Sequence, residues 1–181
     1  MAKLVSKTYG DALFAVAVEE NRMDEFLEAA VGLSEILSTN KDFSELMNHP
    51  KIMKEDKIKI VEETFATRVP KELLGLMTLM VEKGRANEIQ AVFDYFIMLV
   101  KEEKKIGQAV VTTAVELRDT QKEQVTKKLL ETTKYESFEM HYEVDESLIG
   151  GMVIRIGDRV VDSSIKTKLN NLSRELRNIQ V

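Results

Sequence analysis

The chain of 181 residues contains no cysteine. It therefore cannot form disulfides, use a thiol as a nucleophile or bind a metal through thiolates, which suits a reducing compartment. No apolar run approaches the roughly 18 residues that span a bilayer, because even residues 73–81 are interrupted by Gly75 and Thr78. The opening residues, Met1 to Ser6, lack the apolar region of a secretory signal and the Arg/Ser-rich character of a transit peptide. We expect a protein that stays in the cytoplasm and does not insert directly into a membrane.

The chain also has no excess of basic residues. Asp and Glu number 31 against 26 for Lys and Arg, which gives a formal net charge of -5. Such a balance provides no overall attraction for nucleic acid or anionic lipid. Because 44% hydrophobic and 31% charged residues are ordinary for a packed soluble protein, the expected partner is another protein.

Recognisable catalytic groupings are absent as well. The two histidines, His49 and His141, stand far from any Asp/Glu/His group with metal-ligand spacing. No Gly-Lys-Ser/Thr follows the glycines near residue 150, and Ser164 lies outside any Gly-x-Ser-x-Gly elbow. We predict no catalytic, cofactor or metal site. A hydrolase using Asp158, Asp162 and Ser164 is an alternative that would need a metal or a base from elsewhere.

The first 105 residues read as helices separated by short breaks. Four residues mark some of the boundaries: Ser6 as a hydroxyl cap, Asn21 as a break, Pro70 in a first helical turn and Gly84 at a helix end. Apolar residues at helical spacing predict six helices, over residues 6–17, 26–37, 43–47, 54–65, 70–81 and 89–100. The sequence predicts a six-helix bundle over residues 1–105.

Residues 106–181 introduce β-branched runs after Gly107. The order is a strand at 109–115, a helix from Asp119 or Thr120, an alternating strand at 138–144, a hairpin and a last helix. This order predicts a small α/β module with a mixed sheet. The whole chain is therefore expected to be mainly α, with a small α/β part.

Turn-forming residues are densest between residues 144 and 165. Gly150-Gly151 permits positive φ or close backbone approach, and Gly157-Asp158 between two apolar runs predicts a tight hairpin. Asp162-Ser163-Ser164 can cap the N–H groups of the last helix. We interpret these residues as scaffolding.

The first and fifth predicted helices each carry more apolar surface than one stripe. Either both are central helices enclosed by the other four, or one stripe faces a partner helix, for which Met77 and Met80 would be suitably adaptable. The spacing alone leaves both interpretations open.

Several short segments together resemble one known family. They include Leu148-Ile149-Gly150-Gly151, Ile156-Gly157-Asp158, Val161-Asp162, Ser164-Ile165 and Leu169 in the second half, and Tyr9, Ala12-Leu13-Phe14, Ala17, His49-Pro50-Lys51-Ile52, Lys57, Lys83-Gly84-Arg85, Thr113-Ala114 and Leu117 before it. Over essentially the whole chain this pattern is similar to the delta subunit of F-type ATP synthases, whose mitochondrial counterpart is the oligomycin-sensitivity-conferring protein. Glu146 departs from it, where a small or proline-like residue is common.

The resemblance implies a stator subunit that is monomeric alone and present once per complex, at the cytoplasmic face of the bacterial plasma membrane. The N-terminal bundle would grip N-terminal helices of alpha subunits in a groove between its first and fifth helices, and the C-terminal module would receive the end of the b subunits. The implied groove contacts are Tyr9, Ala12, Leu13, Val16, Leu76, Leu79 and Met80. The apolar face Ile165, Leu169, Leu172 and Leu176 is expected to cover its own sheet. A generic cytoplasmic helix-binding adaptor is the alternative.

Overall fold

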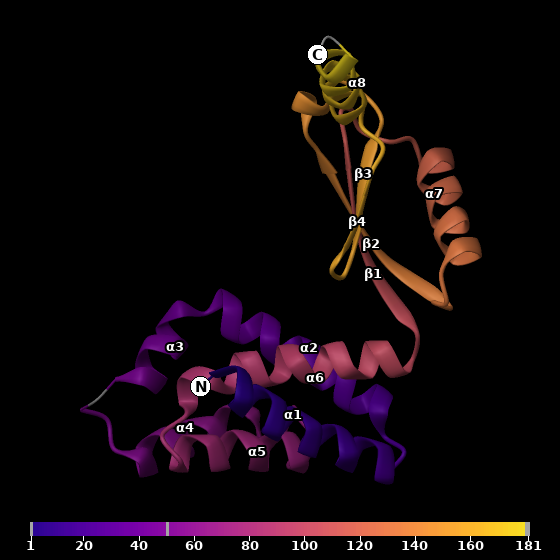
Figure 1. The fold of residues 1–181 in the computed structure, drawn as a ribbon. Helices are drawn as coiled ribbons and strands as arrows, with labels where there is room; N and C mark the ends of the chain where they lie inside the picture. The colour runs from indigo at the N-terminus through magenta and orange to yellow at the C-terminus, as the bar shows by residue number, and fades with distance from the viewer. Residues whose placement is uncertain (1, 50, 180–181) are drawn as a thin grey trace. The chain divides into compact units, whose positions relative to one another are not determined.

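The computed structural model describes residues 2–49 and 51–179, and the chain divides into two compact units, residues 1–101 and 102–181. This boundary lies within the last turn of α6, slightly before the expected boundary at 105/106. The N-terminal unit is helical and the C-terminal unit combines helices with a sheet (Figure 1). The predicted fold class is thus confirmed.

The N-terminal unit consists of helices with one short 3₁₀ turn. Their bounds are α1 Ala2–Glu19, α2 Met23–Thr39, α3 Lys41–Asn48, α4 Lys54–Phe65, α5 Lys71–Glu82, η1 Ala86–Glu88 and α6 Ile89–Glu103. The predicted breaks at Asn21 and Gly84 are confirmed, since both residues have positive φ, of 54° and 70°. At Gly84, the N–H of Arg85 donates to the carbonyl of Met80 across the end of α5, which satisfies a carbonyl that the helix leaves free.

Ser6 does not cap α1, contrary to prediction. The helix already begins at Ala2, and Ser6 is buried inside it. A serine caps a helix only where the preceding backbone is not helical. Nothing in the residues before Ser6 stops the helix, so its start moves towards the N-terminus.

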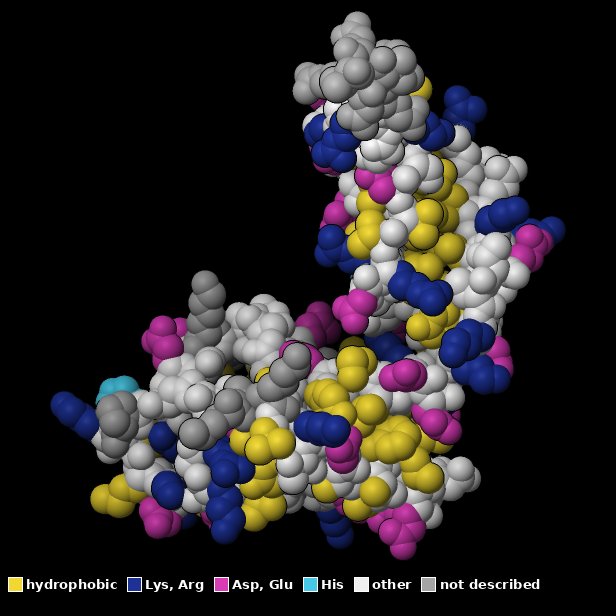
Figure 2. Space-filling model, viewed as in Figure 1, with side chains coloured by type: hydrophobic (Ala, Val, Ile, Leu, Met, Phe, Trp, Pro, Cys, Tyr) yellow, Lys and Arg dark blue, Asp and Glu magenta, His cyan; other side chains and the backbone are white. Residues whose placement is uncertain are grey.

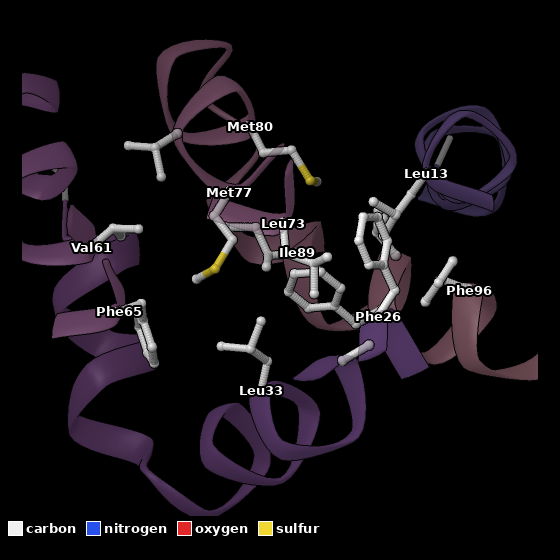
Figure 3. Close-up of a cluster of buried hydrophobic side chains, with 14 of the residues drawn as sticks. Leu13, Phe26, Leu33, Val61, Phe65, Leu73, Met77, Met80, Ile89 and Phe96 are labelled. Carbon is white, nitrogen blue, oxygen red and sulfur yellow. The ribbon is translucent and has the colours of Figure 1, made fainter. Parts of the chain in front are cut away.

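The core of the N-terminal unit gathers side chains from α1, α2 and every later helix of the bundle (Figure 3). Leu73, Met77 and Met80 of α5 are fully buried there, together with Phe26 of α2 and Phe96 of α6. Helix α5 packs against α1, α4 and η1, but Leu79 is 40% exposed and Gly75 is exposed as well. The other helices therefore do not enclose α5 completely.

The C-terminal unit contains β1 (Ile106–Thr113), α7 (Asp119–Thr132), β2 (Ser137–Val144), η2 (Glu146–Leu148), β3 (Met152–Ile156), β4 (Arg159–Asp162) and α8 (Ile165–Ile179). Among the described residues the strands form one sheet in the order β2-β1-β3-β4. β1 pairs with β2 in parallel and with β3 antiparallel, and β3 pairs antiparallel with β4. The predicted mixed sheet is confirmed.

Gly107 lies inside β1, not before it as predicted. A Cβ at this position would collide with the ring of Phe138, its neighbour in register on β2. The glycine leaves room for the ring across the strand, and β1 begins at Ile106, which pairs with Ser137 in register. This contact joins residues far apart in sequence and leaves no local signal.

Candidate partner-binding surfaces

The implied alpha contacts come from α1 and α5, which pack against each other. Tyr9, Val16 and Leu76 are half-buried against the core, whereas Ala12 and Leu79 are exposed. Hydrophobic side chains are visible on the face that carries α1 and α5 (Figure 2). We call this region the α1–α5 surface. It comprises Tyr9, Ala12, Val16, Leu76 and Leu79, together with Gly75 and Arg85.

Leu13 and Met80, the other two implied contacts, are placed differently. Their exposed fractions are 5% and 0%, and both side chains point into the buried cluster (Figure 3). In the free chain they face the core and not a partner. Because side chains on a helix turn by about 100° per residue, Leu79 can be exposed while Met80 is buried.

Two residues of the α1–α5 surface, Gly75 and Arg85, were not among the alpha contacts expected from the sequence. Gly75 is exposed on α5, and a Cβ there would meet nothing within 4 Å, so the surface is open above it. The guanidinium of Arg85 lies 5.8 Å from the ring centroid of Tyr9, within cation–π range. The α5 spacing could have indicated Gly75, whereas the Arg85 contact depends on the turn at Gly84.

An ion-pair cluster joins the α1–α2 turn to the start of α5. Arg22 donates to Glu25 and Glu20 at 2.8 and 2.7 Å, and to Glu72 of α5 at 3.3 Å. The hydrogen bonds to Glu25 and Glu20 raise the pKa of Arg22, and the hydrogen bond from Arg22 lowers that of Glu25. The cluster links the α1–α2 turn to the first turn of α5, one of the two helices of the α1–α5 surface.

The signature residues of the C-terminal unit have structural roles. Gly151 has a φ of 78°, and a Cβ on it would lie 2.5 Å from the carbonyl oxygen of Ser163. The loop at Gly150-Gly151 therefore crosses the β4–α8 junction closely, and Ile165 donates its N–H to the carbonyl of Gly150 at 3.0 Å. Gly157, with a φ of 55°, and exposed Asp158 form the turn between β3 and β4 as predicted.

Asp162 and Ser164 cap α8, as predicted. Asp162 accepts hydrogen bonds from the Ser164 N–H at 2.8 Å and from the Thr167 hydroxyl at 2.7 Å, which lower its pKa. The buried Ser164 hydroxyl oxygen accepts from the Thr167 N–H at 3.2 Å. These contacts give Asp162 and Ser164, two of the three groups named in the hydrolase alternative, a structural role.

The last helix does not cover its own sheet, contrary to prediction. Leu169 and Leu172 are 53% and 54% exposed, and the side chain of Leu176 falls outside the described residues. Helix α8 contacts η2, and its first turn is held at Gly150. The cap therefore fixes where α8 starts without directing its apolar stripe onto the strands.

Two further findings concern the described parts of the chain, residues 2–49 and 51–179. They hold no group of three His, Cys, Asp or Glu side chains suited to a metal ion, and none of their helices combines the length and apolarity of a membrane span.

The two units define a protein made of a helical bundle and a small α/β part. Residues 5–176 match the family model described as ATP synthase delta (OSCP) subunit. The chain belongs to this family, the peripheral-stalk component of F-type ATP synthase, and is a structural, non-catalytic subunit of that complex.

Known relatives agree over nearly the full length. The chain is 50% identical over 181 residues to ATP synthase subunit delta of Lachnoclostridium phytofermentans, with all of both chains covered. It is 33% identical over 177 residues to the same subunit of Desulforudis audaxviator, covering 98% of this chain and 97% of the other. A chain in the cryo-EM structure of the Toxoplasma gondii mitochondrial ATP synthase hexamer has the same fold, with a TM-score of 0.78, 19% identity, and coverage of 94% and 96%.

Proposed function

We propose that the N-terminal unit, residues 1–101, binds the N-terminal helices of alpha subunits through the α1–α5 surface. The supporting observation is that two adjacent helices leave Ala12 and Leu79 exposed around the open position at Gly75. An amphipathic helix could place apolar side chains over Gly75 and cover Leu79. Tyr9 and Arg85 would border the same contact.

We further propose that the C-terminal unit, residues 102–181, receives the b subunit. A chain that joins alpha at one unit and b at the other holds the catalytic head stationary against the torque of the rotor. Proton flow then drives catalysis and not idle rotation of the head. In this role the protein acts without a cofactor, as one copy per complex, at the cytoplasmic face of the plasma membrane.

The alpha contact is tested by Leu79→Glu in the full chain, with binding to an alpha N-terminal peptide measured by calorimetry. Placing a carboxylate into an apolar contact should weaken binding at least about tenfold, roughly 1.4 kcal/mol. Val31→Glu is the matched control, because Val31 on α2 is 41% exposed and Leu79 is 40% exposed. Val31→Glu should bind normally, and wild-type affinity in Leu79→Glu would contradict the proposed surface.

A further inference from the structure

The exposed apolar side chains of α8 form one stripe along the helix. Ile165, Leu169 and Leu172 are 42%, 53% and 54% exposed. Because side chains turn by about 100° per residue, these three positions fall within about 60° of one another around the helix axis. Figure 1 shows that α8 lies apart from α7, the helix that packs against β2. The stripe is therefore open to a partner outside the chain.

Basic side chains border this stripe on both sides. By the same rotation, Lys168 lies about 60° from Ile165 on one side, Lys166 lies about 100° from it on the other, and Arg174 lies opposite. All three basic residues are exposed, and residues 165–174 include no acidic residue. A chain with a formal net charge of -5 thus concentrates positive charge on the helix that carries the exposed stripe.

A strained residue adds an apolar side chain beside the start of α8. Ile149 has a φ of 65° and is 68% exposed, although a β-branched residue disfavours positive φ. It directly precedes Gly150, whose carbonyl accepts from the Ile165 N–H at 3.0 Å. A Cβ on Gly150 would lie 2.9 Å from Cδ1 of Ile165, so the loop and the helix meet closely. Strain that exposes an apolar side chain indicates a role in binding.

The composition of this region distinguishes between kinds of partner. Protein interfaces are enriched in aromatic residues and depleted in lysine. Here the apolar residues are all aliphatic, and lysines border them. Helices that lie on membranes have this composition, because aliphatic side chains enter the boundary between headgroups and acyl chains while lysine amines extend to anionic headgroups. The pattern favours a lipid surface over a protein groove.

We propose that the free chain docks on an anionic lipid bilayer through this region, which we call the α8 face and which consists of Ile149, Ile165, Lys168, Leu169 and Leu172. Helix α8 lies in the plane of the bilayer surface, with its stripe turned towards the acyl chains and Lys168 at the lipid phosphates. Such docking concentrates the free subunit on a membrane before assembly. This inference goes beyond the proposed function, because it requires neither alpha nor b.

Lys168 is the cation best placed for this contact. The Lys166 amine donates to the Ser147 hydroxyl at 3.3 Å and attracts the carboxylate of Asp145, so part of its charge is already balanced. Lys168→Gln should therefore weaken docking about fivefold, the effect of one basic side chain near an anionic surface. Lys127→Gln is its matched control, because Lys127 is an exposed lysine on α7; it should dock normally.

Adjacent residues of α8 provide a second matched pair. Leu169→Glu and Asn170→Glu add the same charge at exposed neighbouring positions, but only Leu169 lies in the stripe. Leu169→Glu should dock at least about tenfold more weakly than Asn170→Glu, because it also loses the burial of a leucine side chain. Ile149→Asn should dock more weakly with an equal or higher melting temperature, since Asn tolerates positive φ. A purely structural role of Ile149 would leave docking unchanged.

Co-flotation of the full chain with vesicles made of equal parts of phosphatidylcholine and phosphatidylglycerol measures docking, and circular dichroism confirms folding. Wild type should bind these vesicles, and raised salt or pure phosphatidylcholine should release it. Absence of wild-type binding, or equal binding of Leu169→Glu and Asn170→Glu, would overturn the proposal. A dimer of the free chain that only Leu169→Glu disperses, without vesicle binding, would assign the stripe to a second copy and also overturn it. Calorimetry with alpha and b tests the proposed function separately, so a failure there is distinguishable from a failure of lipid docking.

Discussion

Replacing Gly151 by alanine should destabilise the C-terminal unit severely. Its φ of 78° is a left-handed conformation, which costs an L-residue with a side chain about 1–2 kcal/mol. The new Cβ would also lie 2.5 Å from the Ser163 carbonyl oxygen and 3.0 Å from the Ser164 Cα. Both atoms belong to backbone and cannot rotate away, so relieving the overlap should add about 1–3 kcal/mol.

The expected loss for Gly151→Ala is therefore about 2–5 kcal/mol. Small domains have unfolding free energies towards the lower end of about 5–15 kcal/mol, so this change would remove much of the stability of the unit. Gly157→Ala separates the two contributions. Gly157 also has positive φ, of 55°, but a Cβ there meets nothing within 4 Å. This control should lose only the conformational part, about 1–2 kcal/mol.

Hydrogen exchange followed by mass spectrometry measures the opening free energy of each unit separately. Peptides from β1 and β3 should exchange faster in Gly151→Ala than in Gly157→Ala, and peptides from α6 should be unchanged in both. Equal exchange of β1 and β3 in the two variants would show that the close approach of Gly151 to Ser163 carries no energetic cost, which would refute the reasoning.

Two further predictions concern acid stability and helix packing. The hydrogen bond from the Ser164 N–H holds the pKa of Asp162 below its ordinary range. The stability that the ionised carboxylate contributes is complete above the unfolded pKa of about 3.9, and it is lost as the pH falls towards the lower folded pKa. Asp162→Asn should therefore flatten the decline in melting temperature of the C-terminal unit between about pH 5 and pH 2, and an unchanged decline would contradict this. Gly10→Ala should lower the melting temperature of the N-terminal unit, because the new Cβ would lie 2.5 Å from Cδ1 of Tyr95. The cost of overpacking, about 1–3 kcal/mol, exceeds the gain of about 1 kcal/mol in helix propensity. A raised melting temperature would be inconsistent with that contact.

Local chemistry predicted the features that depend on a few consecutive residues. The bounds of α4, Lys54–Phe65, agree with the expected range because a periodic apolar face is flanked by breaks. Gly84 was predicted as a helix end, Gly157 as part of a hairpin turn and Ser164 as a cap, each from the residues beside it. In each of these cases the determining interaction spans one turn.

Predictions failed where distant residues decide the outcome. Gly107 was predicted to separate the bundle from the first strand, yet it lies inside β1, where the ring of Phe138 across the sheet occupies the place of a side chain. Ile149 has a φ of 65°, which its β-branched side chain disfavours. That conformation belongs to the turn that leads into the close crossing at Gly151, so no signal at Ile149 itself could have indicated it.

Orientation of a helix was the hardest feature to predict. Leu79 and Met80 are equally apolar neighbours on α5, a helix that is apolar almost all round, and only packing decides which one faces the core. An apolar side chain at helical spacing indicates that the position will be covered, but not by which partner. The same reasoning applies to α8, whose exposed Leu169 and Leu172 fit the spacing of a core stripe. The proposed function assigns part of this apolar periodicity to surfaces that only the assembled complex completes.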